Sequence, residues 1–472
     1  MIPTTPRQPS LETRGPGAGL WALLTASVLL GGLCLGRQAH ATPSFARQTG
    51  MSCSACHTQF PELTPFGRDF KLRGYTLGSV EKVSEDTADG GKALEIDRTP
   101  PLSAMYMASD AFTRNPAPNT TVGPNVDNKG AVSMPQQFSL FYAGEMAPNL
   151  GAFIQATYAD GSFGMDNTDV RWALPTTLLG QDLILGATLN NNPTVQDVWN
   201  STPAWGFPFF GGASLGASPL MNSWAGNVAG LGVYAYCDGM LYAEFSAYRG
   251  VATISASQGI PGFDPTPGAT QPTYLLQGAA PYWRLALTKD WGSNSAELGT
   301  YGMLQTVYPA YPSSAGLDST APTDRYDDVA VDAQYQYIGS AHILTAQASF
   351  LREQDIFGSF ASSSPLTAGS SGQFNTFKVN GNYLFNRTVG GTVAYQKVVG
   401  AADSVLYASS PSNVPNTDAL TYELDYLPWR NTKFSLQYVQ YLTESGSTSN
   451  IDGTGRSAAD DNTLLAEAWL VY

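Results

Sequence analysis

Cys53, Cys56 and His57 stand in the order C-x-x-C-H, the spacing that attaches haem c to a polypeptide. In this chemistry the two thiols add to the vinyl groups of one haem, and the adjacent histidine binds the iron as an axial ligand. A dithiol redox pair or a zinc site is the alternative. However, the chain has no second Cys/His pair to complete a zinc site, and a thioredoxin-like βαβ pattern is absent. We therefore expect one covalently bound haem c, held by Cys53 and Cys56, with His57 on its iron.

The ligand on the opposite side of the iron is left open by the sequence. His342 is the only other histidine beyond residue 41. It is in phase with the apolar residues of its segment, which are expected to face outward. A methionine ligand would raise the reduction potential of the haem. Three methionines in phase with polar neighbours are candidates for this role: Met105, Met107 and Met303. Packing is the alternative role of each, and an open sixth position is a further alternative.

Basic residues cluster around the motif: Arg47, Arg68, Lys71 and Arg73. The three arginines are candidates for holding the haem propionates, because guanidinium groups bind carboxylates in a bidentate manner. Pairing with acidic residues further along the chain is a second interpretation, and Asp169, Glu244 and Asp332 are candidate partners. Ordinary solvated charge is the third.

The first 41 residues have the features of a cleaved secretory signal peptide. Arg7 and Arg14 precede an apolar stretch from residue 20 to residue 35, and Ala39-His40-Ala41 is a cleavage site with small residues at both ends. We expect the mature chain to begin at Thr42. Export agrees with the haem motif, since bacteria attach haem c outside the cytoplasm.

Charge and residue content exclude several classes of protein. The formal net charge of −14 disfavours nucleic-acid binding. Beyond the leader the cysteines are Cys53, Cys56 and Cys237, so no disulfide framework is expected, and Cys237 is interpreted as a free thiol at a tight turn. A hydrolase is not supported, because His57 and His342 provide no nucleophile/His/acid set.

The rest of the chain has the composition of a membrane barrel. Charged residues make up only 13% and aromatic residues 11%, with 24 Tyr and 48 Gly. After the leader no apolar stretch of about 18 residues occurs, so no transmembrane helix is expected. A charge-poor sequence that alternates with a period of two is typical of a transmembrane antiparallel β-barrel, in which one face of each strand meets lipid and the other a polar lumen. A soluble β-sandwich is the alternative.

Five segments show the alternation most clearly: 167–174, 240–248, 328–337, 420–426 and 463–472. In segment 240–248, Leu241 and Phe245 share one face, whereas Tyr242, Glu244 and Ser246 share the other. The last segment ends on an aromatic residue, as the strands that close bacterial outer-membrane barrels do.

Connection lengths alternate between tight turns and long polar links, the pattern of short periplasmic turns and longer outer loops. Tight links are expected near residues 148–149, 179–180, 238–239, 292–293, 339–340, 386–387 and 429–430. The longer links are expected near 113–132, 191–226, 250–279, 306–324, 354–372, 400–416 and 443–460, with one short outer link near 160–161. About sixteen strands result, from near Pro101 to Tyr472. An even number places both ends of the barrel on the periplasmic side.

The predicted domains are a leader (1–41), a haem segment with a linker (42–99) and an all-β outer-membrane barrel (100–472), with residues 84–92 read as the linker. A segment of under about sixty residues is too small to bury a haem alone, whereas a lumen of about sixteen strands is wide enough to hold it. We therefore expect the haem segment to plug or cap the lumen and the barrel wall to complete the haem pocket.

Residues 43–75, PSFARQTGMSCSACHTQFPELTPFGRDFKLRGY, resemble the N-terminus of the fused outer-membrane monohaem cytochrome c–porin family of iron-oxidising bacteria. Residues 190–209 resemble a barrel-loop segment of that family. The resemblance implies an outer-membrane cytochrome that oxidises extracellular Fe(II) and passes the electrons to a periplasmic cytochrome or copper carrier. The haem would be reached from the lumen or the periplasmic side. An outward-directed electron conduit and a porin with a structural or sensory haem are the alternatives.

Overall fold

A computed structural model describes residues 43–77, 81–116, 130–159, 161–205, 224–250, 274–309, 322–356, 371–402, 407 and 411–472. The leader expected over residues 1–41 lies outside these ranges. So do large parts of the expected long connections.

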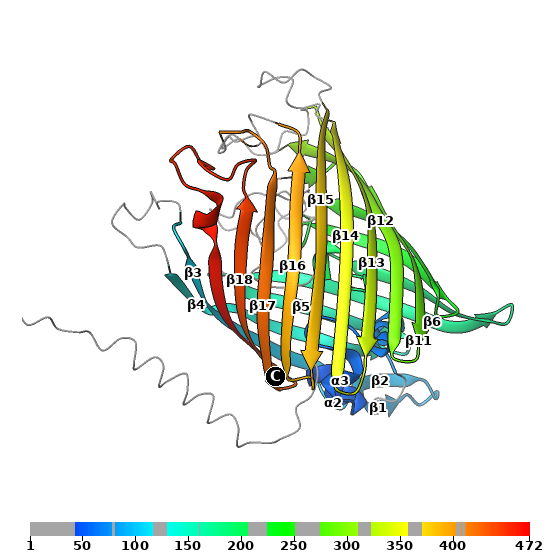
Figure 1. The fold of residues 1–472 in the computed structure, drawn as a ribbon. Helices are drawn as coiled ribbons and strands as arrows, with labels where there is room; N and C mark the ends of the chain where they lie inside the picture. Colours follow the sequence, from blue (N-terminus) through cyan, green and yellow to red (C-terminus); the bar gives the residue numbers. More distant parts are fainter. Residues whose placement is uncertain are drawn as a thin grey trace, which may run out of the picture. The chain divides into compact units, whose positions relative to one another are not determined.

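Sixteen long antiparallel strands form a closed barrel in the described residues (Figure 1). They are β3 (Leu102–Thr113), β4 (Gly130–Ala147), β5 (Leu150–Ala159), β6 (Ser162–Leu178), β7 (Gln181–Asn190), β8 (Val228–Cys237), β9 (Leu241–Gly250), β11 (Ala280–Trp291), β12 (Asn294–Pro309), β13 (Asp324–Ile338), β14 (His342–Ile356), β15 (Ser371–Phe385), β16 (Val389–Gly400), β17 (Thr417–Trp429), β18 (Thr432–Thr443) and β19 (Thr463–Val471). The short β10 (Tyr274–Leu276) pairs with the end of β12. Consecutive strands pair, and β19 closes the barrel on β3. The predicted strand number is confirmed, and the strands of the barrel run from Leu102 to Val471.

Apolar side chains cover the outside of the barrel and polar ones fill the inside. In β9, Leu241 and Phe245 are 47% and 56% exposed, whereas Tyr242, Glu244 and Ser246 are buried in the interior. This arrangement is the inside-out pattern of a transmembrane β-barrel, and it matches the faces predicted from the alternation. Among the described residues, no helix is long and apolar enough to cross a membrane.

Tight turns join the strands at one end of the barrel, which we call the short-turn end. The backbone at Leu179 and Gly180 has φ values of 52° and 80°, and at Asn386 and Arg387 it has φ values of 49° and 55°. Positive φ at two successive residues is what a type I′ hairpin requires, since its twist matches that of the strands. These turns lie where the sequence predicted tight links.

Three short helices form the segment that carries the haem motif: α2 (Pro43–Thr49), α3 (Cys53–Cys56) and α4 (Pro65–Leu72). They lie at the short-turn end of the barrel (Figure 1). Helix α4 begins at Pro65 because proline favours the first helical turn, and the Thr64 side chain accepts a hydrogen bond from the Gly67 amide at 3.1 Å.

The expected linker at residues 84–92 is instead part of a hairpin of β1 (Lys82–Asp86) and β2 (Lys92–Asp97). Lys82 Nζ fixes the hairpin to the barrel through Glu145 of β4, at 2.8 Å. The described side chains of the hairpin are mostly exposed: even Val83 and Ile96, which pair across it, are 46% and 53% exposed, so they do not show the burial pattern that identifies half-buried strands.

The connection after β7 folds into the lumen over residues 191–205. Val195, Val198 and Trp199 are at most 1% exposed. Asp197 forms an ion pair with Arg284 of β11 at 3.1 Å, and the Trp199 carbonyl accepts a hydrogen bond from Gln347 of β14 at 2.8 Å. We call residues 191–205 the lumen segment. The sequence predicted this stretch as a long link, but not its inward course.

Candidate functional site

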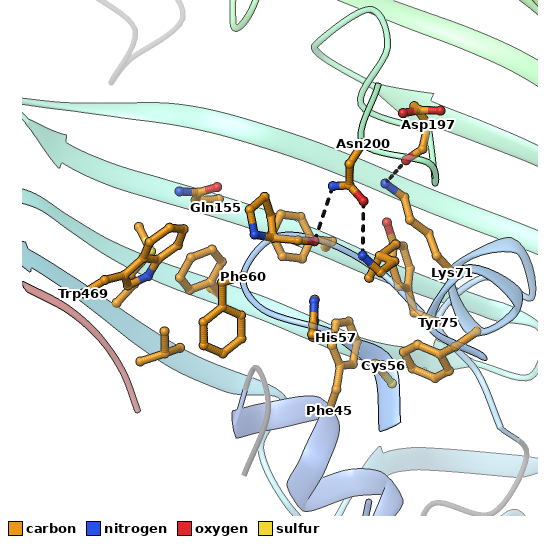
Figure 2. A pocket seen from close by; sticks show the side chains of 18 residues that line it. Phe45, Cys56, His57, Phe60, Lys71, Tyr75, Gln155, Asp197, Asn200 and Trp469 are labelled. Atoms are coloured by element: carbon orange, nitrogen blue, oxygen red, sulfur yellow. Dashed lines mark hydrogen bonds between the residues drawn. The ribbon is translucent and has the colours of Figure 1, made fainter. Parts of the chain in front are cut away.

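An apolar cavity of about 150 Å³ lies between the N-terminal helices and the barrel wall. Cys56 and His57 line it (Figure 2), together with aromatic and apolar residues of both parts of the chain. From the helical segment these are Phe45, Phe60, Phe70 and Tyr75, and from the wall Met105, Phe141, Phe153, Trp469 and Val471. Strands at the two ends of the barrel sequence, β3 and β19, therefore meet at this cavity.

The two cysteines of the motif are presented by a single helical turn. Cys53 and Cys56 are three residues apart in α3, so their side chains lie on the same face. The His57 amide donates to the Cys53 carbonyl at 2.9 Å, which fixes the histidine directly after the turn. The cysteines are not joined in a disulfide. Cys56 lines the cavity, whereas Cys53 is 2% exposed and packs against Ala46 of α2.

Gly67 of α4 allows the two motif helices to pack closely. A Cβ atom at this position would lie 2.2 Å from the Cys56 carbonyl oxygen, closer than any side chain could be accommodated without a backbone shift. Glycine here therefore brings α4 directly onto the C-terminus of α3. Sequence reasoning missed this residue, because a glycine early in a helix gives no sign of what it packs against.

His57 has one ring nitrogen engaged. Its Nδ1 lies 3.2 Å from the Glu62 carbonyl oxygen. Burial lowers the pKa of His57 to about 4, so the ring is neutral and Nδ1 is assigned as the donor. This leaves the Nε2 lone pair for a metal, the state that an axial histidine needs. The His57 ring lies beside Phe60, at 5.3 Å between ring centroids, and Phe60 is followed by Trp469 at 6.0 Å.

Glu62 connects this loop to the wall. Its Oε2 accepts from the Thr58 hydroxyl at 2.7 Å and from the Thr345 hydroxyl of β14 at 3.1 Å. Burial raises the pKa of Glu62 to about 7. The neighbouring Gln59 is 2% exposed, and neither polar atom of its carboxamide has a hydrogen-bond partner within the described part of the chain. Buried polar groups are nearly always paired, so the Gln59 carboxamide is a place where a polar group from outside the described residues could bind.

The four basic residues near the motif bind different parts of the protein. Lys71 lines the cavity, and its Nζ donates to the carbonyl oxygens of Val195 and Asp197 in the lumen segment, at 2.5 and 3.0 Å. Arg68 points to the wall, where it donates to Gln336 at 2.7 Å and Ser295 at 2.5 Å. The remaining two arginines are bound elsewhere.

Arg73 pairs with Asp69 at 2.6 Å, and Arg47 donates to the Leu102 carbonyl. Arg47, Arg68 and Arg73 are not among the residues that line the cavity, and the structure does not bring them together. Their assignment to the propionates stays a prediction that the geometry does not support.

The predicted acidic partners lie in the lumen, as expected from their phase, but pair with other residues. Asp169 accepts from Arg171 at 2.9 Å and from the Tyr75 hydroxyl at 2.7 Å. Asp332 pairs with Arg284 at 2.8 Å. Glu244 accepts from the Tyr242 hydroxyl at 2.8 Å. Of these contacts, the one from Tyr75 ties the helical segment to the wall.

The structure separates the three candidate methionines. Met105 lines the cavity that holds His57. Met107 packs in the same apolar cluster as Met105 but not on the cavity surface, and Met303 belongs to a separate cluster with Trp224 and Tyr282. His342 is exposed, and its Nδ1 contacts the Tyr383 hydroxyl at 2.7 Å. Met105 is therefore the candidate that shares a cavity with His57.

These features fit a haem c, the group that the motif implies. Two thiols stand on one helical face, and one of them, that of Cys56, lines an apolar cavity together with a neutral histidine whose Nδ1 is engaged. The buried carboxamide of Gln59, two residues further along the chain, has no partner within the described part of the chain. Among the described residues, no group of three or more His, Cys, Asp or Glu could hold a metal ion.

Comparison with known proteins gives no family model and no curated protein that matches the chain. Several solved structures are similar in fold. OmpF of Salmonella typhi in complex with daunomycin aligns over 83% of this chain and 100% of its own, with a TM-score of 0.45 and 12% identity. The outer membrane channel DcaP of Acinetobacter baumannii aligns over 79% of this chain and 96% of its own, with a TM-score of 0.44 and 13% identity.

Proposed function

We propose that this protein is an outer-membrane c-type cytochrome that oxidises extracellular Fe(II) and passes the electrons to a periplasmic carrier, either a cytochrome or a copper protein. The observation that carries the proposal is the position of Cys56 and His57 in one apolar cavity that residues of the barrel wall also line. A haem c bound there would supply a one-electron Fe(III)/Fe(II) couple inside a transmembrane barrel. Fe(II) as the donor rests on the resemblance of residues 43–75 to the cytochrome–porin family.

The residues have distinct roles in this proposal. Cys53 and Cys56 hold the group covalently, so it is retained in a barrel that is bathed by solvent at both ends. His57 provides an iron ligand, and Met105 is the proposed sixth ligand because its thioether shares the cavity. A thioether favours the reduced iron and so raises the potential, as the acceptance of electrons from Fe(II) requires. The aromatic and apolar side chains give the site a mostly apolar lining.

The two ends of the barrel assign a side of the membrane to each partner in the proposed transfer. Short turns face the periplasm in bacterial single-chain barrels, and the helical segment lies at that end (Figure 1). We therefore place carrier docking on the periplasmic side and Fe(II) on the side of the long connections. Each Fe(II) that loses one electron becomes Fe(III), and the carrier gains that electron.

A porin with a structural or sensory haem is the second candidate, favoured by the sixteen-stranded barrel itself. One experiment tests the proposal against it. The full-length protein, matured in a host that attaches haem c, is purified in detergent, oxidised and mixed anaerobically with Fe(II). The proposal expects the α-band of reduced haem c to appear in the wild type, and no covalent haem in the Cys53→Ala/Cys56→Ala variant. Covalent haem that Fe(II) does not reduce, although dithionite does, would favour the porin.

A further inference from the structure

Asn200 connects the lumen segment to the loop that orients His57. It is 3% exposed and lies inside the barrel, although its segment leaves β7 at the end opposite the short turns. Its backbone has a φ of 60°, a conformation that asparagine tolerates better than most residues. A buried asparagine in this conformation presents both a donor and an acceptor.

Both ends of the Asn200 carboxamide bind the same short loop (Figure 2). Oδ1 accepts from the Leu63 amide at 3.1 Å, and Nδ2 donates to the Pro61 carbonyl at 3.4 Å. The residue between these two contacts is Glu62, whose carbonyl lies 3.2 Å from His57 Nδ1. Asn200 therefore binds the residues on both sides of Glu62, whose carbonyl oxygen contacts the His57 ring.

Asn200 is itself held by the barrel wall. The carbonyl of the preceding Trp199 accepts from Gln347 of β14 at 2.8 Å, and the following Ser201 donates to Asp332 of β13. Earlier in the segment, Asp197 pairs with Arg284 of β11. Three strands thus fix the place from which Asn200 reaches the loop.

We propose that Asn200 is a positioning residue for the axial histidine, because it immobilises residues 61–63 so that the Glu62 carbonyl holds the His57 ring. The inference rests on the proposed haem site. Outer hydrogen bonds of this kind fix the orientation of a metal-bound histidine and raise its basicity. A more basic imidazole stabilises the oxidised iron. Without the hydrogen bonds from Asn200, residues 61–63 would hold the His57 ring less firmly. The oxidised state of the iron would then be less favourable.

The test compares haem-loaded barrels that differ at one asparagine. Asn200→Ala removes both contacts, whereas Asn200→Asp keeps the acceptor for the Leu63 amide and loses the donor to Pro61. The matched control is Asn192→Ala. Asn192 is also buried in the lumen segment, but its Nδ2 donates to Asn167 of β6, at 2.9 Å, and not to the helical segment.

The midpoint potential is measured by spectroelectrochemistry, and the low-spin ferric EPR spectrum reports the orientation of the axial ligands. We expect Asn200→Ala to shift the potential upward and change the EPR g-values, and Asn192→Ala to match the wild type in both. Asn200→Asp should change the g-values less than Asn200→Ala, and its potential is not compared because Asn200 lines the cavity and a carboxylate there would itself lower the potential. If Asn200→Ala does not fold, the g-values of Asn200→Asp decide. Wild-type values in a folded, haem-loaded Asn200 variant would overturn the inference. A wild-type protein without covalent haem would overturn the proposed function instead.

Discussion

Met105 and Met303 show how the site depends on the position of a residue rather than on its type. Both side chains are buried inside the barrel, at 5% and 0% exposed. Met105 lines the cavity with His57, whereas Met303 packs among aromatic residues in another cluster. From the sequence the two were equivalent, since each is in phase with polar neighbours of its own strand. The distinction comes from the pairing of β3 with β19, which brings Met105 to Trp469 and Val471.

The different positions of Met105 and Met303 predict that the same substitution, methionine to leucine, changes the haem at one position and not at the other. Met105→Leu removes the proposed thioether ligand with little change in volume, at a cost of under about 1.5 kcal/mol in stability. We expect a lower midpoint potential and loss of the sulfur-to-iron charge-transfer band in the oxidised spectrum. Met303→Leu is the control and should leave both unchanged. The ligand assignment would be wrong if the band survived in Met105→Leu or disappeared in Met303→Leu.

At the scale of elements, the lumen segment is fixed by a buried charge network. Arg284 is 0% exposed and pairs with three carboxylates, those of Asp197, Glu297 and Asp332. Its guanidinium also lies 5.0 Å from the centre of the Trp199 ring. One cation thus links the lumen segment to three strands of the wall, and the segment in turn contacts the haem loop.

Loss of this cation leaves buried carboxylates without their partner. We expect Arg284→Ala to destabilise the barrel by roughly 3–5 kcal/mol, the usual cost of breaking a buried ion pair by removing one partner. Urea titration of tryptophan fluorescence in detergent measures the change. Arg325→Ala is the control, because its pair with Asp327 is 53% and 26% exposed and is expected to contribute under about 1 kcal/mol. Equal stabilities of the two variants would contradict the assigned role of Arg284.

The sequence predicted the elements of the wall because lipid and lumen impose a period of two on every strand. Residues 167–174 and 240–248 fell on the correct faces for this reason. The strands of the β1–β2 hairpin are only five and six residues long, too short for such a period to be decisive, and residues 191–205 show no period of two. Their placement depends on contacts between distant residues, such as Lys82 with Glu145 and Asp197 with Arg284.

The same limit applies to the site. C-x-x-C-H identified Cys53, Cys56 and His57 because their spacing along one helical turn is local. The partners of Arg68 could not be predicted in this way, because the direction of its side chain depends on how α4 sits in the lumen. Asn200 and Gly67 were missed for the same reason, since each acts through a residue far away along the chain or in another helix.

At the scale of the whole molecule, the helical segment and the lumen segment are joined to each other and to the wall inside one barrel. Lys71 binds the lumen segment, Tyr75 binds Asp169 of β6, and the Tyr234 hydroxyl of β8 donates to the Leu72 carbonyl at 2.7 Å. This arrangement places a single proposed redox centre within the barrel and near its short-turn end. If the proposed function holds, electrons pass through this centre from one side of the membrane to the other.

Reconstitution into liposomes tests that claim directly. Oxidised soluble cytochrome c is trapped inside the vesicles as the acceptor, and Fe(II) is added outside under anaerobic conditions. We expect reduction of the trapped cytochrome in vesicles that contain the wild-type barrel, and none with the His57→Ala variant or with empty vesicles. Trapped cytochrome that stays oxidised in wild-type vesicles, although the barrel carries covalent haem, would contradict that claim.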